Sequence, residues 1–486
     1  MDRPNILVFM TDHQRGDTAL PEHPARTPNL DRLGAEGVTF ASAFCPTPHC
    51  CPSRATFHTG LYPSRHGVWN NVCNRQALTL GLRAGVRTWS EGLATVGYRL
   101  HYCGKWHVSA LESPANRGWT EHFVSATAAD HHGTSWEAYQ RLAAAPAPGP
   151  RRPGQILRTG YGTYTLYGPS EASRHDHDEK AVDLGVGVIE SARAGAAPWC
   201  LYVGLTGPHD PYLVPPRHVA PYRLENVPLP VSFTDNLMDK PRVYRRLRQA
   251  TFDQLSAIEV RDAIRHYWAY CSYLDELFGR LLAALDRTGQ ADNTLVLYCA
   301  DHGDYCGEHG LFAKGIPCFR GAYHIPAVVR WPAGIVEPGR RVADLVSLAD
   351  WGPTFLAAAD AAVPDDLTGA SLLPFLSGSR PTGWRQALYT QCNGVELYYT
   401  QRAVFDSHWK YVFNGFDDDE LYDLTVDPHE LRNLNGDPAC QAEKRRLCQL
   451  LWRFAQAQDD TATNPYITVG LAPYGPGEAF AEEATP

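Results

Sequence analysis

The chain has 486 residues, of which 44% are hydrophobic and 20% are charged, and these proportions are ordinary for a globular enzyme. Its formal net charge is −9 and it has no basic run, which excludes nucleic acid and an acidic membrane surface as expected partners. No stretch approaches the roughly 20 apolar residues that span a bilayer, so we expect no membrane segment. This length accommodates one large domain and a smaller one.

The cysteines and the first residues bear on the cellular compartment. Thirteen cysteines, an odd number without the spacing of a disulfide framework, favour a reducing environment. The apolar run at residues 6–10 is shorter than the hydrophobic segment of a signal peptide, and no small-residue cleavage pattern follows it. We therefore expect a cytoplasmic protein.

The first 110 residues alternate between strand and helix patterns. The continuous apolar run at residues 6–10 predicts a buried parallel strand. Thr27 is a candidate N-cap for a short helix that has Pro28 in its first turn and ends at Gly37. The other elements expected here are a strand over 38–44, a helix over 87–96 and a strand over 98–103.

The alternation resumes beyond an Ala/Pro-rich stretch at residues 143–150, which predicts an exposed loop. The expected elements are strands over 199–204, 294–300 and 328–332 and a long helix over 260–285. Strands and helices in this order indicate an α/β fold, with a large mixed, mostly parallel sheet sandwiched by helices.

After about Pro381 the pattern becomes that of a smaller α+β subdomain with antiparallel strands and one helix. The expected elements are strands over 387–391, 401–406 and 409–413 and a helix over 441–456. We therefore divide the chain into a large domain over 1–380, a C-terminal subdomain over 381–462 and a tail over 463–486. For the tail we favour a mobile end, and the alternative is an arm on a neighbouring subunit of a homo-oligomer.

The most informative motif begins at Cys50, where residues 50–54 read CCPSR and Thr59-Gly60 follows. This pattern resembles the signature of the sulfatase family, in which the first Cys of C-x-P-S-R is oxidised after synthesis to formylglycine. The resemblance assigns the modification to Cys50 and not to Cys51, which directly precedes the proline. A thiolate zinc site at these cysteines is disfavoured, because no C-x-x-C pair or H-x-x-x-H partner accompanies them.

Acidic residues and histidines follow two of the predicted strands. Asp12 and His13 come after the first strand, and Asp301 and His302 come after the strand over 294–300. Ligands of open α/β sheets bind at the carboxyl ends of the strands. The alternative is that both aspartates are helix caps. The resemblance implies a metal-binding set made of Asp12, modified Cys50, Asp301 and His302.

The expected metal is one divalent cation. Calcium is our first choice because carboxylate oxygens are the ligands that it prefers. Manganese is the alternative, because His302 replaces an oxygen ligand that many sulfatases have and makes the site softer. Whether His13 is also a ligand stays open.

Further motifs carry the charges and protons that cleavage of a sulfate ester requires. By resemblance, Lys105 in the run GKWH contacts the sulfate and the formylglycine oxygens, and His107 draws a proton from the formylglycine hydroxyl. His209 in the run PHDP protonates the departing alkoxide, and Lys314 lies opposite the leaving group. Arg54 holds the formylglycine and the metal-side oxygens through its fixed fork of donors.

The alcohol part of the substrate is not readable. Asn70 or Asn71, just beyond the signature helix, is expected to contact substrate oxygens. The run HDHD at 175–178 offers a second metal site, but we favour a polar loop. The expected substrate-binding residues are Asn70, Lys105, His209 and Lys314.

Taken together, the resemblance implies an alkaline-phosphatase-like fold and a sulfuric ester hydrolase that releases an alcohol and inorganic sulfate. The expected partners are a small-molecule or carbohydrate sulfate ester and a formylglycine-generating or equivalent maturation enzyme. One alternative is a phosphonate monoester hydrolase or phosphodiesterase. The run GKWH disfavours this alternative, because those hydrolases replace its lysine and histidine. The other is a non-catalytic anion-binding protein in which Cys50 stays a thiol.

Overall fold

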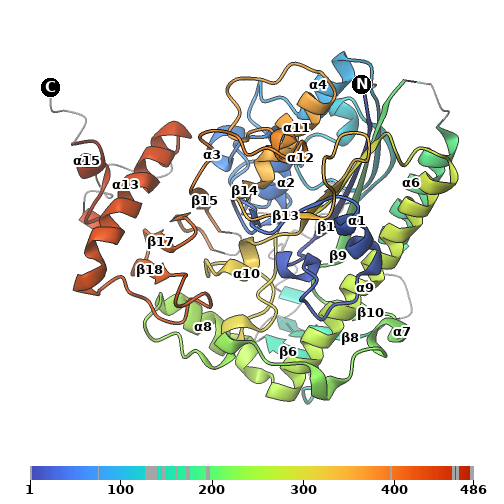
Figure 1. Ribbon diagram of the computed structural model, residues 1–486. Helices are drawn as coiled ribbons and strands as arrows, with labels where there is room; N and C mark the ends of the chain where they lie inside the picture. Colours follow the sequence, from blue (N-terminus) through green and yellow to red (C-terminus); the bar gives the residue numbers. More distant parts are fainter. Residues whose placement is uncertain are drawn as a thin grey trace.

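Figure 1 shows the computed structural model of the protein, which is built around an eight-stranded sheet. The structure describes residues 3–74, 76–125, 140–141, 143–144, 149–158, 162–170, 176–192, 197–394, 397–461, 466 and 470–481. Residues 145–148 of the stretch over 143–150 lie outside the described residues, and so does His175.

The eight strands have the order β13-β2-β12-β11-β1-β9-β4-β5, and β12 alone among them runs antiparallel to its neighbours. The prediction of a mixed, mostly parallel sheet is therefore confirmed. In sheet order the strands are β13 (Arg340–Val342), β2 (Val38–Phe40), β12 (Ala327–Arg330), β11 (Thr294–Ala300), β1 (Asn5–Asp12), β9 (Trp199–Pro208), β4 (Arg99–Lys105) and β5 (Thr120–Ser125).

Both faces of this sheet are buried, as the unbroken apolar run of β1 predicts. Ile6, Val8 and Met10 enter one hydrophobic cluster, and Leu7 and Phe9 enter the other. In Figure 1, α6 and α9 lie together along one side of the sheet. The helices of the first cluster are α2 (Cys50–Thr59), α4 (Trp89–Thr95) and α11 (Trp351–Ala358), and those of the second are α1 (Pro28–Ala35), α6 (Asp176–Ser191) and α9 (Ala257–Arg287).

A separate four-stranded antiparallel sheet follows near the C-terminus, with α13 packed on it (Figure 1). Its fourth strand, β18, is missing from the sequence-based prediction because its residues Glu-Leu-Tyr-Asp lack an apolar run. The elements are β15 (Leu388–Cys392), β16 (Gln401–Phe405), β17 (Trp409–Asn414), β18 (Glu420–Asp423) and α13 (Gln441–Ala457).

The described part of the tail packs on its own chain. Ala472 and Ala479 join the hydrophobic cluster of α13, and Glu478 forms an ion pair with Arg445. The short helix α15 (Pro476–Ala479) thus lies against α13. Neither prediction for the tail included this apolar contact with the subdomain.

Short elements complete the described fold. Three small sheets pair β3 (Ala43–Phe44) with β14 (Val346–Ser347), β6 (Gln155–Arg158) with β7 (Gly162–Thr165), and β8 (Tyr167–Pro169) with β10 (Tyr212–Val214). The short helices are α3 (Pro63–His66), α7 (Pro216–Val219), α8 (Arg242–Ala250), α10 (Arg320–Tyr323) and α12 (Leu373–Leu376). Within the described residues, no helix has both the length and the hydrophobicity that crossing a membrane requires.

One predicted element differs from the structure in more than its ends, and another begins later than expected. The single strand expected over 38–44 is two strands, because the chain leaves the central sheet after β2 and β3 pairs with β14 instead. The helix expected over 87–96 begins only at Trp89, because Thr88 and Glu91 form a capping box at its N-terminus.

The contact between β4 and β9 has no room for a side chain at Gly104, which precedes Lys105. Its φ is 105°, and a Cβ atom there would lie 1.9 Å from the carbonyl oxygen of Gly204. Gly97 also has a positive φ, of 91°, but a Cβ atom there meets nothing within 4 Å. We expect Gly104→Ala to cost more than ~2 kcal/mol of stability and Gly97→Ala only ~1 kcal/mol.

Thermal unfolding of the two variants measures this difference. Gly104→Ala should lower the Tm clearly more than Gly97→Ala, which carries the backbone strain without the clash. Equal shifts of the Tm would contradict the close approach of the two strands.

Candidate active site

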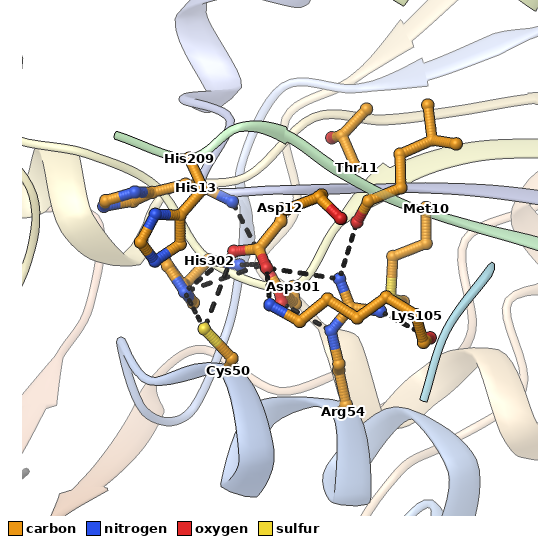
Figure 2. Close-up of polar contacts among 12 residues, drawn as sticks. Met10, Thr11, Asp12, His13, Cys50, Arg54, Lys105, His209, Asp301 and His302 are labelled. Carbon is orange, nitrogen blue, oxygen red and sulfur yellow. Dashed lines mark hydrogen bonds and ion pairs between the residues drawn. The ribbon is translucent and has the colours of Figure 1, made fainter. Parts of the chain in front are cut away.

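Side chains from four neighbouring strands meet at one edge of the central sheet (Figure 2). Asp12 ends β1 and Lys105 ends β4. His209 follows β9 and Asp301 follows β11. These strands have the order β11-β1-β9-β4 and run parallel, so their carboxyl ends lie side by side. The first turn of α2 faces the same edge and brings Cys50 to it.

Cys50 lies in the first turn of α2 and is buried. Its Sγ atom lies 3.6 Å from Oδ1 of Asp12 and 3.3 Å from Nε2 of His302. Burial alone would raise the pKa of the thiol, but the positive charges of Lys105 and Lys314 lower it well below its ordinary value. The N-terminus of a helix also favours negative charge. The site therefore stabilises an anion at this position.

Arg54, one turn further along α2, is fully buried and fixes the carboxylate of Asp301. Its Nε atom donates to Oδ2 of Asp301 over 2.7 Å. Its Nη1 atom donates to the hydroxyl of Tyr202 over 3.1 Å and to the carbonyl oxygen of Lys105 over 3.2 Å. The Nζ atom of Lys105 in turn contacts the carboxylate of Asp12. Two buried cations thus balance two buried carboxylates.

His209 and Lys314 form a second part of the site. Nζ of Lys314 lies 2.8 Å from Nε2 of His209. Nδ1 of His209 lies 2.7 Å from the carbonyl oxygen of Asp210 and 3.2 Å from its Oδ1. Burial and Lys314 lower the pKa of His209, but the negative charge of Asp210 outweighs them together with the contact to Cys50, so the pKa is raised.

His13 lies beside this centre and contacts other carboxylates. Its backbone N–H donates to Oδ1 of Asp301 over 3.1 Å. Its ring nitrogens lie 3.4 Å from Oδ1 of Asp210 and 3.3 Å from Oδ2 of Asp304. His13, His209 and Asp210 form a group of their own, with ligand atoms within 4.8 Å of one another. His13 is thus linked to His209 and is not part of the group around Cys50.

The group around Cys50 has the donors that a divalent metal requires. Asp12, Cys50, Asp301 and His302 are buried, and their ligand atoms lie within 4.8 Å of one another. Nδ1 of His302 lies 2.9 Å from the carbonyl oxygen of Gly303, which keeps the proton on Nδ1 and leaves the lone pair of Nε2 for a metal. Two carboxylates suit calcium, and an imidazole beside them also suits manganese. The residues present therefore fit such an ion.

Two further predicted site residues, His107 and Asn70, differ in whether their side chains contact this centre. His107 follows β4 with a φ of 52°, and its contact with the thiol of Cys50 helps to lower the pKa of that thiol. The amide of Asn70 is used within its own loop, since its Nδ2 donates to the carbonyl oxygen of Gln76 over 3.0 Å and its Oδ1 accepts from the N–H of Leu78 over 2.9 Å. Contact of Asn70 with a substrate stays a prediction.

The run at 175–178 is not the polar loop that we favoured, because α6 begins within it. His177 is exposed, whereas Asp178 is buried. The carboxylate of Asp178 accepts hydrogen bonds from the backbone N–H groups of Thr206 (2.7 Å) and Gly207 (3.0 Å). Asp178 therefore anchors the end of β9, close to His209.

Sequence reasoning missed three residues of the site. Asp210 and Asp304 lie inside the runs PHDP and DHGD, so the motifs that identified their neighbours could have identified them too. His49 precedes Cys50 and is 1% exposed, and its ring nitrogens have no hydrogen-bond partner among the described residues. Burial and the charge of Lys314 lower its pKa to about 3, so it is neutral. No sequence pattern marks it.

Known proteins resemble this chain over nearly its whole length. The family model Sulfatase matches residues 4–361, and the model N-sulphoglucosamine sulphohydrolase, C-terminal, matches residues 307–457. The choline-sulfatase of Rhizobium meliloti (strain 1021) is 28% identical over 476 residues, which are 92% of this chain and 85% of that protein. The N-acetylglucosamine-6-O-sulfatase of Bacteroides thetaiotaomicron is 25% identical over 536 residues, 96% of this chain and 89% of that protein.

Among solved structures, the phosphonate monoester hydrolase of Agrobacterium radiobacter has a TM-score of 0.76 at 24% identity, covering 94% of this chain and 96% of that one. This likeness confirms the alkaline-phosphatase-like fold. The chain belongs to the sulfatase family, since that family's model covers most of it. It is a sulfuric ester hydrolase, as are its named sulfatase relatives.

Proposed function

We propose that this chain hydrolyses sulfate monoesters with a formylglycine formed from Cys50 and with a divalent cation held by Asp12, Asp301, His302 and residue 50. The observation that carries the proposal is the position of Cys50, buried between carboxylates and cations at a helix N-terminus. Calcium is the preferred cation and manganese the alternative.

The formylglycine and the cation, both acquired after synthesis, supply chemistry that the encoded side chains lack. When formed, the hydrated aldehyde of formylglycine supplies an oxygen nucleophile. When bound, the cation supplies fixed positive charge against the oxygens of the sulfuryl group. The remaining tasks fall to encoded residues, which bind the anion and move protons.

The cationic side chains bind and orient the sulfate group. Lys105 is buried and Lys314 is partly exposed, and both lower the pKa of the side chain at position 50. Their ammonium groups therefore act on whatever anion occupies this place, and a buried charge acts more strongly than one in water. Arg54 holds Asp301 and, through it, the metal-binding group.

Two histidines handle protons on different sides of the site. His209 holds a proton for the departing alcohol, which its raised pKa supports. His107 accepts a proton from the side chain at position 50, which its contact with that side chain supports. Asp210 orients His209 through the contact with Nδ1.

The substrate class, maturation partner and compartment belong to the same proposal. Choline-sulfatase and N-acetylglucosamine-6-O-sulfatase among the relatives support a small-molecule or carbohydrate sulfate ester as substrate. The motif at Cys50 calls for a formylglycine-generating or equivalent enzyme. No disulfide joins any of the thirteen cysteines, all of which the structure describes, and this supports a reducing compartment such as the cytoplasm.

A comparison of leaving-group-matched esters tests the reaction. An aryl sulfate should be hydrolysed with a kcat/KM at least ~10-fold above that of the corresponding aryl phosphonate monoester, because in this proposal Lys105 binds the sulfate and His107 helps to release it. Faster turnover of the phosphonate would favour the alternative that the fold of the Agrobacterium enzyme suggests.

Removal of one carboxylate tests the metal. Asp12→Asn should lower metal content and reduce turnover by ~10²-fold or more, because the site loses an anionic ligand. Metal content by mass spectrometry and the rise of Tm on adding Ca²⁺ or Mn²⁺ measure the effect. The matched control is Asp304→Asn, which removes a buried carboxylate outside the metal group. Burial raises the pKa of Asp304 to about 7, so the control removes less negative charge than Asp12→Asn does. Unchanged metal content in Asp12→Asn would refute the ligand set.

A further inference from the structure

A second group of metal-ligating side chains lies behind Cys50. Sγ of Cys51, Sγ of Cys73 and one ring nitrogen of His107 all lie within 4.8 Å of one another. These residues come from three separate segments, namely α2, the loop after α3 and the turn after β4. The two cysteines are thiols and not a disulfide.

The three segments are tied together independently of these side chains. Oδ1 of Asn71 accepts a hydrogen bond from the backbone N–H of Cys51 over 3.1 Å, which fixes the loop of Cys73 to the start of α2. The amide of Asn70 closes the same loop through the backbone of Gln76 and Leu78. Ligands held in this way need little reorganisation on binding.

His107 shows a feature that its proposed task leaves unexplained. Its Nδ1 atom is buried and has no hydrogen-bond partner among the described residues. A buried polar atom without a partner costs roughly 1–3 kcal/mol. The backbone at His107 is also left-handed, with a φ of 52°, which is unfavourable for a residue other than glycine. A ligand at Nδ1 would account for both.

We infer that Cys51, Cys73 and His107 form a binding site for a soft divalent metal of the Zn²⁺ class, separate from the metal group that contains Asp12. Two thiolates and one imidazole are a donor set that zinc uses when a fourth position stays open. Soft thiolate ligands also select against calcium and magnesium. A Zn²⁺ ion with two thiolates and a neutral imidazole has no net charge, so it requires no further counter-ion in this buried place.

A metal ion at this site has a consequence for catalysis. Cys51 is fully buried, whereas Cys73 is 9% exposed and His107 is partly exposed, so the loop is the side of the site nearer to solvent. A neutral imidazole that binds a metal through one nitrogen carries its proton on the other. His107 can then donate a hydrogen bond but cannot accept a proton. Bound Zn²⁺ therefore inhibits turnover, a consequence that rests on the function proposed for His107.

Cobalt binding tests the site without any turnover. The protein carries Cys50→Ala, which removes the only thiol of the other metal group, and is kept under a non-thiol reductant. Titration with Co²⁺ should then produce a thiolate-to-cobalt charge-transfer band that saturates at one equivalent. Adding Cys73→Ala should abolish the band, whereas adding Cys448→Ala, which removes a buried thiol of α13, should leave it.

Zinc inhibition of the active enzyme tests the consequence. Wild-type turnover of an aryl sulfate should fall as Zn²⁺ rises at constant Ca²⁺, and Cys73→Ala should raise the inhibitory concentration at least ~10-fold. Absence of the cobalt band, or a band that survives Cys73→Ala, would overturn the site. A cobalt band together with turnover that Zn²⁺ does not affect would leave the site standing and refute the task of His107.

Discussion

Replacing Cys50 by alanine is expected to abolish sulfate ester turnover and to leave the fold unchanged. Alanine cannot be converted to formylglycine, so the variant lacks the nucleophile. Removal of a nucleophile lowers kcat by roughly 10⁶-fold in well-studied hydrolases. The fold should persist, because Cys50 lies in the first turn of α2, where alanine is accommodated, and it forms no disulfide. Turnover of an aryl sulfate and the circular dichroism spectrum measure the two parts.

Cys51→Ala is the control for this experiment. Cys51 neighbours Cys50 in the chain but faces Cys73, so its removal should leave turnover within ~10-fold of wild type in the absence of zinc. Mass spectrometry of the peptide that contains residue 50 should show the loss of sulfur and the gain of oxygen in active wild-type protein. Full activity of a protein in which Cys50 is still a thiol would exclude formylglycine as the nucleophile.

Much of the fold could be predicted from sequence patterns whose physical cause is known. The unbroken apolar run of β1 predicts a strand buried on both faces, and its side chains do enter both hydrophobic clusters. The long helix expected over 260–285 is α9, which begins three residues earlier, at Ala257, because Ser256 and Glu259 form a capping box. The reversed direction of β12 was not predictable, since an apolar run reads the same in a parallel and an antiparallel strand.

The candidate site, like the fold, was predictable from the sequence only in part. Asp12, Lys105 and Asp301 stand next to strand patterns, so their convergence at one sheet edge could be expected from the sequence. The neighbours of Cys51 could not, because Cys73 and His107 reach it from distant segments and no fixed spacing relates them. Short spacing within one segment identifies a metal site in a sequence, whereas a site assembled from several segments appears only once they are packed.

His209→Ala is expected to slow poor substrates far more than good ones. A departing alkoxide of high basicity needs a proton, and general acid catalysis contributes about 10²–10⁴-fold. An aryl leaving group with a low pKa needs little help. Alkyl sulfates should therefore lose ~10²-fold or more in kcat/KM, while an activated aryl sulfate should lose less than ~10-fold. A series of sulfate esters with leaving groups of different pKa measures the slope, which should steepen in the variant.

The pH profile and a second variant separate proton donation from simple binding. The acid must be protonated to act, so wild-type turnover of alkyl sulfates should fall as pH rises through the pKa of His209, and this limb should vanish in His209→Ala. Lys314→Ala is the control, since Lys314 lies 2.8 Å from His209 but binds the sulfate oxygens in this scheme. It should slow aryl and alkyl sulfates alike. Equal losses on both esters in His209→Ala would make His209 a binding residue and leave the departing oxygen without an assigned donor.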